Sequence, residues 1–441
     1  MNKIRVLMAT VSFGVGGSYV QIHSKYLNKD HFDVTACALF EDGEKGELLR
    51  RNGIRTEVLH GDFSAVKDLL GNVDILHINQ TGYKHQPILR MAKKVGVPVA
   101  IETDIFGCYP NSPDVEKIVD LHLWVSKNCA WSYMNRENIP IGDFLPKSRV
   151  LYDPIDVEEF DKHKPSEQQI YDFRDELGTN NDVTLICRVG RPDISKWSPF
   201  IIHMLWYLVR KIPAKLLIVG GTPKWVSKKI AKYHLEKNVI DFGVATEDEL
   251  MKIYHSFDLL THCSRIGESF GRTIGEAMAA AKPVVVNSTP WMDNAQIELV
   301  DNSVTGFVAN TPRAFSDAVT LIAKDKHLAR NMGNLGFQKV KNQYDARSNT
   351  RLLEKYYVEM LARKGMLDDE ELLSDYKGIL EFPSTDDIIA YPIEYQRMLK
   401  NYFGNVSIIN RSWLKIKQFT QQRPRRGYIF KDTHLHIPPI F

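Results

Sequence analysis

The chain has 441 residues, of which 44% are hydrophobic and 25% are charged. This length exceeds one ordinary hydrophobic core, so it favours two domains of a globular protein. A net charge of +3 indicates no overall attraction to nucleic acid or to a membrane. The five cysteines are scattered without a Cys-x-x-Cys pair, which indicates neither a disulfide framework nor a zinc site and fits a reducing compartment.

Apolar runs are short throughout. The stretch 4–9 is too short for a signal peptide, and no window of about 18 apolar residues predicts a membrane span. We therefore expect a cytoplasmic protein with no transmembrane segment, at most peripheral to a membrane.

The first half of the chain alternates β-rich runs with helical patterns. Strands are expected at 4–10, 32–40, 55–59, 73–78, 97–102, 122–125 and 149–152, with helices such as 19–27 and 86–95 between them. This alternation predicts an α/β fold in which βαβ units build a parallel, doubly wound sheet.

A pause at 152–165, which contains Pro154 and Pro165, predicts a domain linker. A second α/β series follows, with strands expected at 183–189, 214–219, 239–242, 259–263 and 283–286. We expect domains at 1–160 and 161–345, one further helix at 346–364 and a C-terminal extension at 365–441. Two Rossmann-like domains of this kind bind ligands in a cleft at the carboxyl ends of their strands.

Two loops that follow strands carry weak signals for anion binding. Gly14, Gly16 and Gly17 let backbone N–H groups approach an anion, but a dinucleotide fingerprint would need a glycine where Tyr19 stands. A tight strand–helix turn explains this loop equally well. Arg191 and Lys196 follow a strand of the second domain, where they would neutralise a diphosphate or remain solvated surface cations.

The strongest motif follows the strand that ends near Cys263. Glu268 lies on a loop, and Glu276 lies about five residues inside a helix that should begin at Phe270 or Gly271. Free N–H groups at a helix start suit a phosphate, and a carboxylate suits a diol. A glycosidase pair needs carboxyls about 5–9.5 Å apart, whereas the backbones here should lie roughly 10–12 Å apart. An ordinary helix with capping acids is the alternative.

These motifs resemble those of the retaining glycosyltransferases of family 4, which have the GT-B fold. Three segments match the family's Glu-x7-Glu pattern: Glu268–Gly271, Glu276–Ala279 and Pro283–Val285. The family's Gly-Arg…Lys element is matched by Gly190, Arg191 and Lys196, and the resemblance covers about residues 3–360.

The resemblance implies roles for single residues. Arg191 and Lys196 would hold the diphosphate of a nucleotide sugar, Glu276 the ribose, and Glu268 the transferred sugar. The implied donor-binding residues are Gly16, Gly17, Arg191, Lys196, Glu268, Ser269, Phe270, Gly271, Arg272, Thr273 and Glu276. The implied reaction retains configuration and uses no metal, with which the absence of an Asp-x-Asp triplet agrees. No cofactor is expected, because the nucleotide sugar is a co-substrate.

The chain departs from the family pattern at three places. Thr103 or Asp104 stands where the family usually has a histidine, and we take Glu268 and Asp104 as the catalytic candidates. Trp197 and Ser269 each replace a glycine. These departures leave the identity of the donor and the catalytic detail open. A sugar-nucleotide epimerase of similar fold and a non-catalytic nucleotide-sugar-binding protein are the alternatives to a hexosyltransferase.

The C-terminal extension is split by charge. Residues 368–394 hold nine acids and one base, whereas residues 397–431 hold nine bases and no acid, interspersed with aromatic side chains. Residues 395–431 would suit a polyanionic acceptor such as nucleic acid or a phosphate-linked lipid. Solvation, or pairing with the acidic half, is the alternative. His434 and His436 alone make a poor metal site.

Overall fold

The computed structural model describes residues 3–403 except 15, 16, 81, 83, 108, 109, 195 and 291. The chain divides into two compact units. The first combines the residues up to Asp156 with Tyr344–Tyr391, and the second combines Val157–Gln343 with the residues from Pro392 onward. Among the described residues, none of the helices combines the length and apolar character that a membrane span requires.

The first unit is built on a seven-stranded parallel sheet in the order β3-β2-β1-β4-β5-β6-β7. Its strands are β1 Ile4–Ser12, β2 Phe32–Glu41, β3 Arg55–Val58, β4 Ile75–Gln80, β5 Val99–Asp104, β6 Leu121–Trp124 and β7 Ser148–Val150. Its helices are α1 Ser18–Tyr26, α2 Glu44–Arg51, α3 Val66–Leu70, α4 Gln86–Val95, α5 Pro113–Glu116, α6 Lys127–Arg136, α7 Ile141–Phe144, the 3-10 helix η1 Leu145–Lys147, α17 Ala346–Arg363 and α18 Glu370–Lys377.

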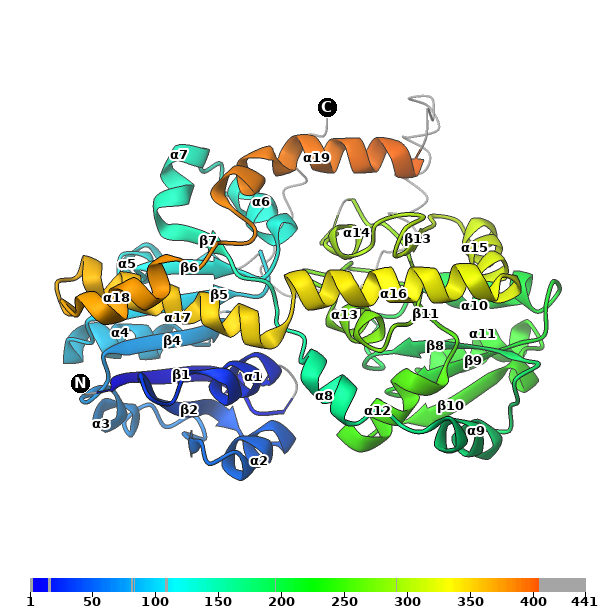
Figure 1. The fold of residues 1–441 in the computed structure, drawn as a ribbon, viewed down its shortest axis with the longest axis horizontal. Coiled ribbons are helices and arrows are strands. Elements are labelled where there is room, and N and C mark those ends of the chain that lie inside the picture. Colours follow the sequence, from blue (N-terminus) through cyan, green and yellow to red (C-terminus); the bar gives the residue numbers. More distant parts are fainter. Residues whose placement is uncertain are drawn as a thin grey trace. The chain divides into compact units, whose positions relative to one another are not determined.

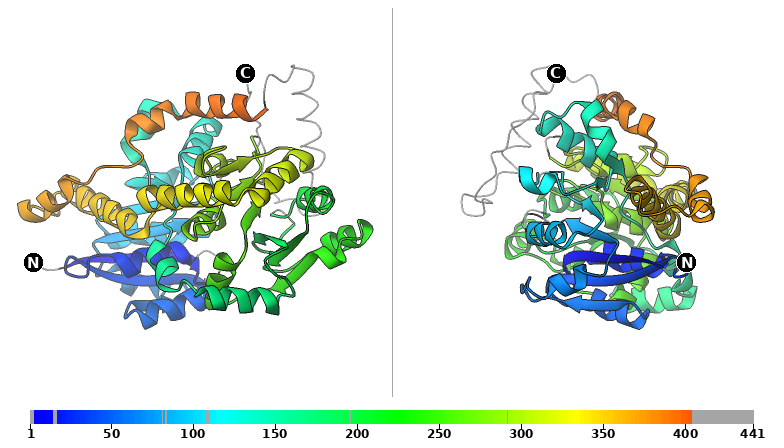
Figure 2. Two further views of the ribbon diagram at one scale, coloured as in Figure 1. Left: turned by 45° about the vertical axis from the view of Figure 1, so that its right-hand side comes forward. Right: turned by 90° about the vertical axis from the view of Figure 1, so that its left-hand side faces the viewer.

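Helices cover both faces of this sheet (Figures 1 and 2). Because side chains alternate along a strand, Val6 and Met8 of β1 pack toward Leu353 of α17, while Leu7 and Ala9 pack toward α4. A strand that is apolar on both faces is typical of the centre of a parallel sheet. Helix α17, far away in the sequence, thereby completes the core of the first unit.

The second unit has a six-stranded parallel sheet in the order β10-β9-β8-β11-β12-β13. Its strands are β8 Thr184–Val189, β9 Ala214–Val219, β10 Val239–Gly243, β11 Leu259–His262, β12 Val284–Val286 and β13 Gly306–Val308. Its helices are α8 Val157–Lys162, α9 Glu167–Glu176, α10 Phe200–Leu208, α11 Lys224–Lys232, η2 Glu236–Asn238, α12 Glu247–Ser256, α13 Arg272–Ala279, α14 Gln296–Leu299, α15 Pro312–Lys324 and α16 Lys326–Gln343. Helix α19 Thr385–Phe403 contributes to both units.

The α/β, doubly wound architecture predicted from the sequence is confirmed. The division between the units falls inside the expected linker, after Asp156. Helix α8, which lies within that linker, belongs to the second unit because Phe160 packs against Tyr254, with ring centroids 5.6 Å apart. Residues 346–363 form helix α17 and lie in the first unit. The expected extension contains α18 and α19, and its residues 404–441 lie outside the described part of the chain.

Candidate functional site

The loop between β11 and α13 is shaped by two glycines with left-handed backbone conformations. Gly267 has φ +68°, and a Cβ atom there would lie 1.5 Å from the carbonyl oxygen of Asp293. Gly271, the N-cap of α13, has φ +107°. The loop is tied down because Glu268 N–H donates to Gln296 Oε1 at 3.1 Å and Ala295 N–H donates to Glu268 O at 2.8 Å. These bonds fix the position of Glu268.

The Glu268 carboxylate is mostly buried, with 13% of its side chain exposed, and it is paired at both oxygens. Lys196 Nζ donates to Oε2 at 2.7 Å, and His262 Nε2 lies 3.0 Å from Oε1. Burial alone would raise the pKa of Glu268, but Lys196 and His262 outweigh it and lower the pKa to about 2. Glu268 is therefore an ionised acceptor group at neutral pH. The structure brings together Glu268 and Lys196, as the resemblance implies.

Lys196 follows the carboxyl end of β8, where two loops approach closely. A Cβ atom at Gly220 would lie 2.4 Å from the Gly190 carbonyl oxygen. Beneath this turn the buried Arg188 guanidinium lies 3.8 Å from the Trp197 ring centroid and donates to Gly190 O at 2.8 Å. Burial lowers the pKa of Arg188 to about 10. Arg191, by contrast, is exposed at the end of the strand.

The start of α13 contributes the remaining predicted donor residues. Ser269 and Phe270 are buried, and the helix begins at Arg272, one residue beyond the expected start. Arg272 Nε lies 3.1 Å from Glu276 Oε1 in an i,i+4 pair. Tyr254 OH donates to Glu276 Oε2 at 2.6 Å. Both oxygens of Glu276 are thus oriented by neighbouring side chains.

Sequence reasoning missed three residues of this arrangement. Arg188 supports the Gly190 turn, His262 contacts Glu268, and Tyr254 contacts Glu276. Trp197 stands where the family has glycine. This larger side chain indicated that another group, here Arg188, packs against it beneath the loop. His262 is the last residue of β11, so it was a candidate for the same edge of the sheet. Tyr254 lies on α12 and gave no signal.

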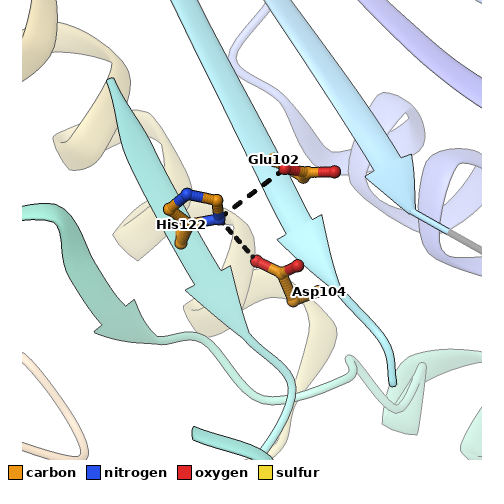
Figure 3. Close-up of side chains that lie close together, drawn as sticks. All are labelled: Glu102, Asp104 and His122. Atoms are coloured by element: carbon orange, nitrogen blue, oxygen red, sulfur yellow. Dashed lines mark hydrogen bonds and ion pairs between the residues drawn. The ribbon is translucent and has the colours of Figure 1, made fainter. Parts of the chain in front are cut away.

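The remaining predicted residues belong to the first unit. Gly17 is the N-cap of α1, and Gly16 lies outside the described residues. Asp104 ends β5 with its side chain buried, and His122 Nδ1 lies 2.8 Å from its Oδ2 (Figure 3). Its neighbour Thr103 bonds instead to His77 at 2.7 Å. The two catalytic candidates, Glu268 and Asp104, therefore lie in different units.

Comparison with known proteins finds relatives for the second unit. Residues 169–339 match the family model for glycosyl transferases group 1. An uncharacterized glycosyltransferase, MJ1607 of Methanocaldococcus jannaschii, is 30% identical over 162 residues, which cover 36% of this chain and 40% of the relative. The N-acetyl-alpha-D-glucosaminyl L-malate synthase of Bacillus anthracis is 26% identical over 304 residues, covering 66% of this chain and 76% of the relative. The matches thus span less than half of one relative and about three quarters of the other.

The whole fold also has solved counterparts. The crystal structure of Anabaena Alr3699/HepE in complex with UDP and glucose has a TM-score of 0.66 at 19% identity and covers 80% of this chain and 99% of its own. Residues 169–339, which match the family model, contain Arg191, Lys196, Glu268 and Glu276. Residues 169–339 of the second unit thus resemble the glycosyl transferases group 1, and the chain has a fold close to that of GT-B glycosyltransferase structures.

Proposed function

We propose that this chain is a retaining glycosyltransferase that moves a sugar from a nucleoside-diphosphate sugar to an acceptor without a divalent metal at the diphosphate. The proposal depends on one observation: the mostly buried, ionised Glu268 is paired with Lys196 just before α13, and Glu276 is held inside that helix. The group 1 glycosyl transferase match over this segment and the two curated relatives favour a transferase over an epimerase or a non-catalytic binding protein.

The chemistry of these groups fits a nucleotide sugar. Lys196 donates to Glu268 and to the Gly267 carbonyl oxygen, which leaves its third N–H for a phosphate oxygen. The N-terminus of α13 adds positive potential, so departing diphosphate charge is stabilised as it develops. Ionised Glu268 accepts hydrogen bonds from hydroxyls of the sugar, and Glu276 accepts them from ribose. The exposed Arg191 supplies a second cation to the diphosphate.

The acceptor belongs to the same proposal. We place an anionic acceptor at residues 395–431, because residues 397–431 contain nine bases and no acid. Of these, residues 404–431 lie outside the described part of the structure. Contacts between basic side chains and phosphates weaken steeply with salt. A strong salt dependence of acceptor binding therefore supports this part of the proposal.

Isothermal titration calorimetry with UDP, GDP and ADP and with their hexose derivatives tests the donor assignment. Because a hydrogen bond to a charged group contributes roughly 1.5–3 kcal/mol, Glu276→Gln should weaken nucleoside diphosphate and intact donor alike by about 10-fold or more. Lys196→Met should do the same, whereas Glu268→Gln should weaken only the intact donor. The exposed residues Lys228 and Glu236 provide the matched controls Lys228→Met and Glu236→Gln. Unchanged nucleotide affinity in Glu276→Gln and Lys196→Met would refute the assignment.

A further inference from the structure

A cluster of buried ionisable side chains lies inside the first unit, apart from the proposed donor residues. Glu102 and Asp104 are two residues apart on β5 and therefore share a face of the sheet. His122 of β6 stands opposite Glu102 in the strand register. Figure 3 shows the three side chains converging; His122 Nδ1 lies 2.8 Å from Asp104 Oδ2 and 3.7 Å from Glu102 Oε2.

The spacing of these side chains suits a small cation. One ligand atom from each of the three residues lies within 4.8 Å of the others. Ligands at about 2.0–2.2 Å from a tetrahedral zinc ion have separations in this range. The set of two carboxylates and one imidazole is thus both close enough and of the right chemistry to share one ion.

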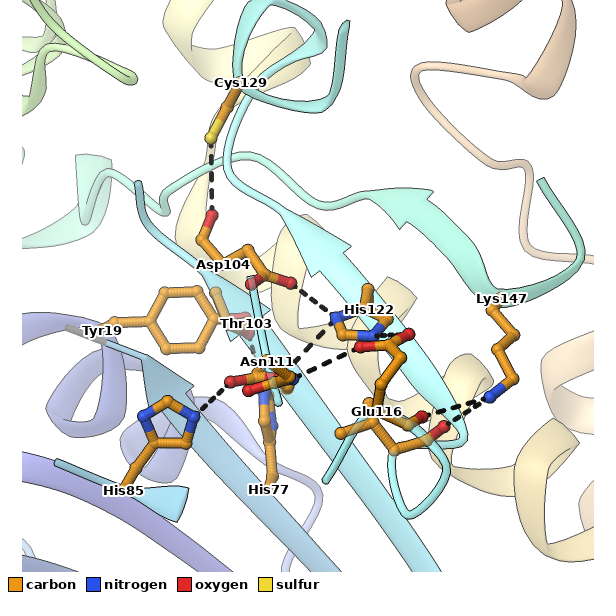
Figure 4. Close-up of polar contacts among 12 residues, drawn as sticks. Tyr19, His77, His85, Thr103, Asp104, Asn111, Glu116, His122, Cys129 and Lys147 are labelled. Atoms are coloured by element: carbon orange, nitrogen blue, oxygen red, sulfur yellow. Dashed lines mark hydrogen bonds and ion pairs between the residues drawn. The ribbon is translucent and has the colours of Figure 1, made fainter. Parts of the chain in front are cut away.

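The neighbouring side chains resemble the outer shell of a metal site (Figure 4). The second ring nitrogen of His122, Nε2, lies 3.1 Å from Glu116 Oε1. Metal-binding histidines usually donate this second N–H to a carboxylate, which fixes the ring and leaves the other nitrogen for the metal. Asn111 Nδ2 donates to Glu102 Oε2 at 2.6 Å and orients that carboxylate. Glu116 is partly exposed, so it marks a route of entry.

His85 provides an independent observation. Its side chain is fully buried, and its Nε2 lies 2.6 Å from Glu102 Oε1. Yet neither of these two atoms has a partner with hydrogen-bond geometry among the described residues, and His85 Nδ1 also has none. The contact with Glu102 is an ion pair when His85 is protonated, but the buried Nδ1 atom remains unsatisfied, which is costly.

The charges of the cluster favour the same conclusion. Two buried carboxylates, those of Glu102 and Asp104, face two histidines, and the partly exposed Glu116 contacts the second ring nitrogen of His122. The nearby Lys147 ammonium donates to the backbone carbonyls of Glu116 and Val119. The histidines therefore neutralise the two buried carboxylates only when both are protonated. Buried charges are normally paired or coordinate metals.

We propose that Glu102, Asp104 and His122 bind one Zn²⁺ ion, while His85 contacts the other oxygen of the Glu102 carboxylate. Mixed imidazole and carboxylate ligands suit zinc, whereas Mg²⁺ prefers oxygen ligands and retains several waters. Bound zinc would join the carboxyl end of β5 to β6. Asp104 then serves as a metal ligand rather than as a contact to the reacting sugar. The proposal concerns the first unit alone and does not rest on the proposed donor site.

Zinc titration of the full chain tests this inference. The purified protein is stripped with a chelator, dialysed and titrated with Zn²⁺ in a calorimeter, and its metal content and thermal unfolding are then measured. We expect one Zn²⁺ to bind per chain and to raise the unfolding temperature. The same concentration of Mg²⁺ should leave the unfolding temperature unchanged. Bound Co²⁺ should give the visible absorption of a tetrahedral site.

Variants distinguish zinc binding at this site from zinc binding by histidines elsewhere in the chain. His122→Gln and the isosteric Asp104→Asn should abolish stoichiometric binding, and Glu116→Gln should weaken it by about 10- to 100-fold. The double variant His434→Ala/His436→Ala, which removes the tail histidines, should bind as the wild type does. Circular dichroism verifies that each variant is folded. Absence of stoichiometric Zn²⁺ binding by the wild type, or binding that persists in folded Asp104→Asn, overturns the proposal. Nucleotide affinity measured in parallel shows whether the donor assignment stands independently.

Discussion

At the scale of single residues, the two glutamates of the motif are held differently. Glu268 is paired with a lysine and a histidine, whereas Glu276 is paired with an arginine and a tyrosine hydroxyl. The sequence predicted that Glu268 and Lys196 would serve one ligand, because the family pattern places them together. It gave no indication of Tyr254, and it placed His262 only near the end of a strand, because both side chains reach the glutamates through the tertiary fold.

The environment of Glu268 predicts a pH dependence of stability. Its pKa in the folded chain is about 2, compared with an ordinary value of 4.5, so its ionised form stabilises the fold. This contribution, about 3 kcal/mol by linkage at about 1.4 kcal/mol per pKa unit, is complete above the ordinary pKa and is lost as pH falls toward 2. Glu268→Gln should therefore be less stable than the wild type at pH 7.

Urea unfolding at pH 7, 5 and 3 measures this effect. The stability difference between the wild type and Glu268→Gln should be constant from pH 7 to pH 5 and should shrink toward pH 3, since protonation then removes the advantage of the carboxylate. Glu236→Gln, at an exposed site, serves as the control. A difference that does not change between pH 5 and pH 3 would show that Glu268 is not held in its ionised form by Lys196 and His262.

At the scale of elements, the sequence predicted long, strongly patterned segments best. Helix α4 has the predicted bounds because Gly96, with φ +89°, ends it. Strand β13 was missed, because three residues beginning with a glycine give no alternating pattern. The cluster at Asp104 was missed for another reason. Its members come from two strands and from α4 and α5 with their flanking loops, so no linear motif brings them together.

The β11–α13 loop predicts a specific effect of glycine replacement. Gly267→Ala should destabilise the chain by about 3 kcal/mol or more, because the new Cβ would overlap the Asp293 carbonyl oxygen and φ is +68°. The matched control is Gly365→Ala, which has nearly the same φ, +67°, but no atom within 4 Å of its Cβ. That variant should lose only about 1–2 kcal/mol.

Thermal unfolding and UDP titration distinguish the two glycine variants. Gly267→Ala should unfold at a markedly lower temperature and bind UDP more weakly, since Glu268 and the start of α13 move with the loop. Gly365→Ala should keep its UDP affinity. Equal destabilisation in both variants would mean that backbone conformation alone, and not close packing against Asp293, constrains Gly267.

At the scale of the whole molecule, the sequence allowed more site residues to be named in the second unit than in the first. The residues that we propose for donor binding in the second unit could be named from the sequence, because their motifs are continuous and follow strands β8 and β11. In the first unit, position alone made Asp104 a catalytic candidate. Burial and the contact with His122 place its side chain in a polar cluster that sequence could not reveal.

Turnover of a nucleotide sugar tests the central claim most directly. The chain, without added Mg²⁺ or Mn²⁺, is incubated with a panel of α-linked nucleotide hexoses, and the products are followed by proton nuclear magnetic resonance. We predict release of the nucleoside diphosphate together with a sugar that first appears as the α-anomer, at a rate that falls in Glu268→Gln and does not change in Glu236→Gln. First appearance of the β-anomer, formation of an epimerised nucleotide sugar, or a failure to consume any donor in the panel would contradict the assignment as a retaining glycosyltransferase.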